Sequence, residues 1–166
     1  MSASAGRWPV ASLGPIGRAR TVARATPSAA WVEGELDAPY ETVWPWVADL
    51  ETSVPRFDSQ VRSLRVIERQ AAEAEVEVLR IEATSFGLRV PFEVRLENGF
   101  CLMQARLRLY LVVMAAEPAD RGRRTRFFHM EAVPLPGTRP LRARLGRAVR
   151  DDFRNLSRLA ASGFDH

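Results

Sequence analysis

The residues with the clearest capacity for chemistry are one histidine and two acids. His129 is followed two residues later by Glu131, and Asp152 lies farther along the chain. A histidine paired with a carboxylate can transfer protons near neutral pH, because the unperturbed pKa of an imidazole is about 6.5. These three residues are therefore our candidates for acid–base catalysis. The alternative is a histidine on the surface beside solvated charges.

A strand must position the histidine and the glutamate. The spacing of apolar residues predicts a strand over Arg124–Val133. Because side chains alternate along a strand, His129 and Glu131 share a face with Phe127. If Phe127 points inward, both polar side chains do as well.

A helix must position the aspartate. Leu141–Ala161 has helical periodicity, and Asp152 lies on its apolar side. That side also carries Leu145, Val149 and Leu156. A buried carboxylate needs a partner, which His129 or Arg80 could supply. Alternatively, Asp151 and Asp152 pair with arginines on the exposed side of the helix.

The pattern of the rest of the chain predicts a sheet and two short helices. Pro39 and the apolar spacing after it predict short helices at residues 39–50 and Ser53–Asp58, with a kink at Pro45. Alternation predicts the other strands at Trp31–Asp37, Gln60–Glu68, Glu73–Ala83, Phe86–Glu97, Phe100–Ala105 and Tyr110–Glu117. Asn98-Gly99 is a hairpin signal, and Pro91 predicts a bulge or an edge position.

One face of the clearest strand could line a binding cavity. Phe86–Glu97 alternates without a break, so its apolar side chains share one face. An apolar surface with a few polar groups is what a hydrophobic ligand requires. The expected ligand-binding residues are Phe86, Leu88, Val90, Phe92, Val94, Gln104, Val112, Met114, Phe127, His129, Leu145, Val149, Asp152 and Leu156. The alternative is a core filled by these side chains.

Charge and composition limit the function classes. The chain has 166 residues and a net charge of +4. Four arginines and no acid precede Glu33, while the rest of the chain has equal numbers of basic and acidic residues. We therefore expect a disordered tail at 1–29, a neutral domain at 30–163 and no nucleic-acid partner. No apolar run is long enough for a transmembrane segment, and a single cysteine fits a cytoplasmic location.

Familiar cofactor and metal motifs are missing from the sequence. It contains no glycine-rich phosphate loop, no metal-ligand spacing and no nucleophile elbow. We therefore expect no cofactor and no metal.

The order of elements and two segments resemble a known superfamily. The segments are ELDAPYETVWPWVADLETSVPRFDSQVRSLRVIE (Glu35–Glu68) and RTRFFHMEAVP (Arg124–Pro134), followed by an arginine-rich amphipathic helix. Over about residues 31–162 the chain resembles the START-like, or SRPBCC, superfamily, in particular its bacterial polyketide cyclase/dehydrase and lipid-transport proteins. The resemblance implies an α+β helix-grip fold, in which a seven-stranded curved antiparallel sheet wraps around the C-terminal helix and encloses a cavity.

The resemblance also implies a class of ligand. Members of the superfamily bind lipids, polyketides, sterol-like molecules or quinones, and some cyclise or dehydrate a bound polyketide. Our leading hypothesis is a binding protein, monomeric or homodimeric, that holds a small hydrophobic molecule without turnover. The alternative is a cyclase or dehydratase that uses His129 with Glu131 or Asp152. A third possibility is an interaction module that acts through the arginine-rich tail.

Overall fold

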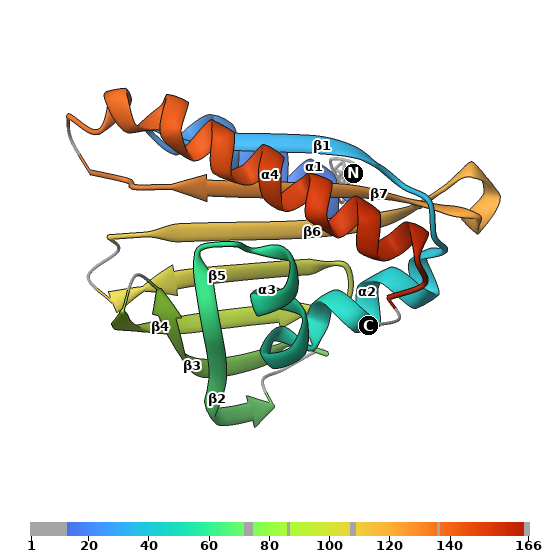
Figure 1. The fold of residues 1–166 in the computed structure, drawn as a ribbon, viewed down its shortest axis with the longest axis horizontal. Helices are drawn as coiled ribbons and strands as arrows, with labels where there is room; N and C mark the ends of the chain where they lie inside the picture. The colour runs from blue at the N-terminus through green and yellow to red at the C-terminus, as the bar shows by residue number, and fades with distance from the viewer. Residues whose placement is uncertain (1–12, 72–74, 86, 107–108, 136, 165–166) are drawn as a thin grey trace, which may run out of the picture.

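A computed structural model describes residues 13–71, 75–85, 87–106, 109–135 and 137–164 (Figure 1). The strands are β1 (Ala30–Leu36), β2 (Val61–Ala71), β3 (Glu77–Ser85), β4 (Leu88–Glu97), β5 (Phe100–Ala105), β6 (Leu111–Ala119) and β7 (Arg124–Ala132). The α-helices are α1 (Pro15–Ala25), α2 (Tyr40–Ala48), α3 (Leu50–Phe57) and α4 (Arg142–Ala161). Two 3-10 turns lie at Asp120–Gly122 and Arg139–Leu141. Within these ranges, no helix is long and apolar enough to cross a membrane.

The strands form one antiparallel sheet in the order β1-β7-β6-β5-β4-β3-β2. Consecutive strands from β2 to β7 are neighbours, and β1 pairs with β7 at the opposite edge. The turn between β4 and β5 contains the predicted Asn98-Gly99 pair, and the positive φ of Gly99 (+77°) suits this turn. The α+β helix-grip fold expected from the sequence is therefore confirmed.

The proline in β4 lies where the strand has one neighbour. β4 pairs with β3 from Leu88 to Leu96, but it pairs with β5 only from Phe92 to Glu97. Pro91 lies just outside this second ladder, and its pairing with Glu82 continues without a register shift. Of the two geometries predicted for Pro91, the structure has the edge position, where a missing N–H donor is tolerated.

The long helix α4 packs over β1 and β7, on what we call the inner face of the sheet (Figure 1). Gly34 in β1 allows this close approach, because a Cβ atom there would lie 2.6 Å from Cζ of Phe153 in α4. Leu156 on the same helix is fully buried in the main core. Since α4 lies toward one edge of the sheet, it leaves the strands near β2 to be covered by other elements.

The short helices α2 and α3 provide that cover. They are separated at Asp49, whose ψ of 76° is not helical. Pro45 lies inside α2, as expected, and the helix ends three residues later. α3 packs against β2 and also contacts α4, and its buried Phe57 belongs to the main core. α3 therefore faces the inner side of the sheet at the β2 edge.

The outer face of the sheet is covered by α1, and this corrects the prediction of a disordered tail. Residues 15–25 are helical, whereas 1–12 lie outside the described residues. Ile16, Ala19 and Ala23 are buried at helical spacing against an apolar cluster that includes Phe128 and Met130. The prediction was wrong for this segment because small alanines give a weak periodic signal. The boundary at residue 30 therefore divides elements that share one core.

Candidate functional site

A cavity of about 280 Å³ lies between α3 and the inner face of the sheet. Its volume is near the lower end of the range for small-molecule sites, ~300–1,000 Å³. Most of the wall is apolar, with Asp58, Gln60, Ser85 and Tyr110 as the exceptions. The lining residues are Val54, Asp58, Gln60, Val61, Leu64, Ile81, Ala83, Ser85, Val90, Phe92, Met103, Tyr110 and Val112.

The cavity forms where β4 extends beyond the covering helices. On its inner face, Val94 is fully buried, while Val90 and Phe92 are half-buried and line the cavity. Leu88, at the end of the strand, is 68% exposed. Among the described residues, none of the lining side chains belongs to α4. The expected cavity between sheet and C-terminal helix is thus corrected to one beneath α3, because α4 lies over β1 and β7.

The predicted ligand-binding residues fall into distinct positions. Val90, Phe92 and Val112 line the cavity. The main core beside it contains Val94, Met114, Phe127 and Leu156, and a smaller cluster under α4 contains Leu145 and Val149. Phe86 lies outside the described residues.

Gln104 lies on the face away from the cavity, contrary to prediction. Gln104 pairs with Leu111 of the neighbouring strand β6, and Leu111 belongs to the apolar cluster covered by α1. The inner face of β5 instead carries Met103, a cavity residue that pairs with Val112. The sequence could not distinguish the faces of β5, because both are largely apolar.

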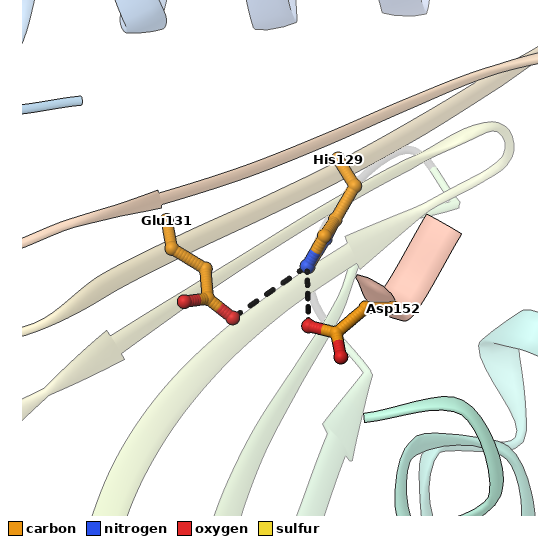
Figure 2. A group of neighbouring side chains, drawn as sticks. All are labelled: His129, Glu131 and Asp152. Carbon is orange, nitrogen blue, oxygen red and sulfur yellow. Dashed lines mark ion pairs between the residues drawn. The ribbon is translucent and has the colours of Figure 1, made fainter. Parts of the chain in front are cut away.

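Three charged or titratable side chains meet in the interior beside the cavity. His129 and Glu131 extend from β7, and Asp152 extends from α4 toward them (Figure 2). Nε2 of His129 lies 3.6 Å from Oε1 of Glu131 and 3.6 Å from Oδ2 of Asp152. All three side chains are at most 2% exposed. The structure therefore brings together the three residues proposed for proton transfer, and it supplies His129 as the neighbour of Asp152.

The other suggested partners of the two aspartates lie on the surface. Arg80 pairs with Glu68 at 2.9 Å, and both side chains are exposed. Asp151 pairs with Arg154 on the outside of α4. Surface pairing thus holds for Asp151 and is wrong for Asp152.

Each buried carboxylate is held through one of its oxygens. The hydroxyl of Tyr110 donates a hydrogen bond to Oε2 of Glu131 at 2.6 Å. The backbone N–H of Ser59 donates a longer bond to Oδ1 of Asp152 at 3.4 Å. The remaining oxygen of each carboxylate is the one that faces His129. Both carboxylates are therefore oriented by neighbours outside the cluster.

The low polarity of the interior shifts the pKa values of this region. Burial raises the pKa of Asp58 to about 7, and the charges of Asp152 and Glu131 add to the increase. Burial also raises the pKa of Asp152 and that of Tyr110. For His129, burial alone would lower the pKa, but the neighbouring carboxylates raise it to about 10. With only these neighbours, the imidazole is thus a cation between two acids at neutral pH.

Sequence reasoning missed the residues that link the cluster to the cavity. Tyr110 lines the cavity and also contacts Glu131, and the charges of the cluster raise the pKa of Asp58. Both had a weak signal in the sequence, since Asp58 ends a predicted helix and Tyr110 begins a predicted strand. A polar residue at the end of an element is common on any surface, so neither position stood out.

Comparisons with known proteins define the fold. No family model matches the sequence, and a search of curated proteins finds no match. Among solved structures, TTHA0849 of Thermus thermophilus is 18% identical with a TM-score of 0.57, over 82% of this chain and 99% of that chain. A protein of Nitrosospira multiformis is 11% identical with a TM-score of 0.60, over 80% and 95% of the respective chains. Ara h 8.0201 is 12% identical with a TM-score of 0.50, over 81% and 97%. At such identities these likenesses show a shared fold, which is the helix-grip architecture.

Proposed function

We propose that the protein binds a small apolar or amphipathic molecule, such as a lipid, polyketide or quinone-like compound, in the cavity beneath α3, without turnover. The observation that carries this proposal is the composition of the cavity wall. Nine of its thirteen residues are apolar, so burial of apolar ligand surface would supply most of the affinity. The helix-grip fold agrees with this class of function, because the superfamily that the sequence resembles uses the fold to bind hydrophobic molecules.

The polar groups of the wall indicate how a ligand would be oriented. The hydroxyl of Tyr110 is already donated to Glu131, so its oxygen is free to accept a hydrogen bond from the ligand. Asp58, with its pKa raised to about 7, can donate when protonated. A ligand with a hydroxyl or carbonyl group at one end and an apolar body fits this wall. With a single cysteine, Cys101, the chain cannot form an intramolecular disulfide, and this agrees with the cytoplasmic location we propose.

The test is a matched pair of tryptophan substitutions in β4. Val90 lines the cavity, whereas Leu88 has the same strand parity but is 68% exposed. Val90→Trp should fill the cavity and weaken binding of anilinonaphthalene sulfonate by at least about tenfold. Leu88→Trp should bind this dye like the unmodified protein. Dye titration by fluorescence measures both, and equal affinities for the two variants would contradict the proposed site.

An acid–base enzyme is the second candidate, because His129, Glu131 and Asp152 lie together beside the cavity. In a cyclase or dehydratase, Tyr110 would touch the substrate and the histidine would act through Glu131. His129 is not among the lining residues, which favours binding over catalysis. His129→Ala separates the two functions. An enzyme would lose turnover of a polyketide substrate and keep dye binding, whereas a binding protein has no turnover to lose.

A further inference from the structure

The cluster behind the cavity has the composition of a metal-ligand set. His129, Glu131 and Asp152 each offer one ligand atom, and these atoms all lie within 4.8 Å of one another. An imidazole nitrogen with carboxylate oxygens is a donor set used by zinc and other divalent transition metals. The sequence made these three residues candidates for proton transfer, but their spacing is not typical of a metal site, because Asp152 lies on a different element from the other two.

The separations inside the cluster are too long for hydrogen bonds. A charge-assisted hydrogen bond between nitrogen and oxygen is typically about 2.7–2.9 Å long. Both contacts of Nε2 in His129 are 3.6 Å. Two ligands of a tetrahedral metal are about 3.3–3.6 Å apart when the metal–ligand bonds are about 2.0–2.2 Å. Two of the three spacings therefore match those between metal ligands, and the two carboxylate oxygens, within 4.8 Å of each other, would close on the ion as it binds.

Two of the inward-facing atoms have no other partner. Among the described residues, Nε2 of His129 and Oδ2 of Asp152 are fully buried and accept or donate no hydrogen bond. An unpaired polar atom in the interior costs free energy, so such atoms usually have a role. Nδ1 of His129 also has no partner there. A metal ion would displace the Nε2 proton of the metal-free imidazolium, and the imidazole, with its proton on Nδ1, would then present the lone pair of Nε2 to the centre of the cluster.

The two carboxylates are oriented by neighbouring hydrogen-bond donors. Metal sites commonly have such donors, which do not bind the metal but hold its ligands in place. Tyr110 holds the far oxygen of Glu131, and the N–H of Ser59 holds the far oxygen of Asp152. The free oxygens then point to one place (Figure 2). Hydrogen bonds of this kind fix the direction of ligand atoms and contribute to metal affinity.

We infer that His129, Glu131 and Asp152 form a binding site for one divalent transition-metal ion of the zinc type. The ion would be held by one nitrogen and two carboxylate oxygens, and its double positive charge would balance the two buried acids. Tyr110 is a positioning residue for this site. Because Tyr110 also lines the cavity, the site lies one residue away from the proposed ligand.

The test uses the full chain freed of metal by a chelator. Zn²⁺ is added and the bound metal is measured by elemental analysis after gel filtration; Co²⁺ is titrated in parallel and followed by its visible absorption. We expect one ion per chain and the intense absorption of a four-coordinate Co²⁺ site. Glu131→Gln and Asp152→Asn should each weaken binding by at least about tenfold. Asp151→Asn, which removes an exposed acid paired with Arg154, is the matched control and should bind normally.

The outcomes are distinguishable even if one variant is poorly folded. Circular dichroism checks each variant, and the unmodified protein alone tests the inference through its stoichiometry and Co²⁺ spectrum. Tyr110→Phe keeps all three ligands and should weaken Co²⁺ binding by about tenfold. The inference is overturned if the unmodified protein binds neither ion in a one-to-one ratio, or if folded Glu131→Gln and Asp152→Asn bind like the control. Dye binding in the cavity is measured separately, so either proposal can fail alone.

Discussion

The hydroxyl of Tyr110 donates a 2.6 Å hydrogen bond to Oε2 of Glu131, and this contact joins the cavity wall to the buried cluster. Tyr110 precedes β6, and Glu131 lies on β7, which pairs with β6. A ligand that contacts the tyrosine is therefore one hydrogen bond away from three titratable side chains. This relationship makes Tyr110 the residue whose replacement tests both the cavity and the cluster.

Tyr110→Phe should destabilise the protein by about 1–3 kcal/mol, because a buried carboxylate oxygen loses its donor. Chemical denaturation measures the free energy of unfolding. Tyr40→Phe is the matched control, since Tyr40 donates an equally short bond of 2.6 Å to Asn98 at an exposed position. Its loss should cost less than about 1 kcal/mol. A similar cost in both variants would mean that the contact with Glu131 has no special weight.

Asp58 should make stability depend on pH. The pKa of Asp58 is about 7 in the folded protein and 3.8 for an unperturbed aspartate, so the folded state holds the proton more tightly. Its contribution to stability is fully present below about pH 4 and is lost as the pH rises through about 7. Asp58→Asn removes this dependence. In metal-free protein, the free energy of unfolding of the variant relative to that of the parent should increase by on the order of 1–2 kcal/mol from pH 5 to pH 8, allowing for partial exposure.

Denaturation at a series of pH values provides the measurement. Asp37→Asn serves as the control, because Asp37 is an exposed acid whose side chain is 75% accessible. A constant difference between Asp58→Asn and the parent across this pH range would contradict a raised pKa at Asp58.

Val149→Trp should destabilise the protein without blocking the cavity. Val149 is fully buried and packs with Ala30 and Leu145 under α4, away from the lining residues. Overpacking such a position typically costs about 1–3 kcal/mol. Dye affinity of the folded variant should stay within about twofold of the parent, in contrast to Val90→Trp. A large loss of dye affinity would place the bound dye under α4 instead of under α3.

The alternation of strands predicted the direction of several buried side chains. In β7, the parity shared with Phe127 placed His129 and Glu131 on one face, and the structure has all three on the inner face. The apolar line of α4 likewise included Asp152, although pairing with arginines on the exposed side was the alternative. Such periodic signals are local, so a single sequence carries them in full.

Relationships between distant elements were harder to obtain. The placement of α4 over β1 depends on the close contact of Gly34 with Phe153, and no local sequence pattern predicts this contact. Because α4 packs over β1 and β7, it does not cover the strands that line the cavity, and α3 covers them instead. The cover over the outer face was also missed, although β6 carried a hint. Residues 111–116 are all apolar and all buried, which indicates a strand covered on both faces and therefore a second covering element.

That second cover leads to the last prediction. Ile16 in α1 is 2% exposed and packs in the outer-face cluster with Phe128, whereas Leu13, just before the helix, is 56% exposed. Ile16→Ala should therefore lower the free energy of unfolding by roughly 2–4 kcal/mol, from lost burial and the space left behind. Leu13→Ala should change it by less than about 0.5 kcal/mol. Dye affinity should be unchanged in both variants, because the cavity lies on the opposite face of the sheet. If residues 15–25 were a dispensable tail, the two substitutions would be equally harmless, and thermal or chemical denaturation of the pair distinguishes these outcomes.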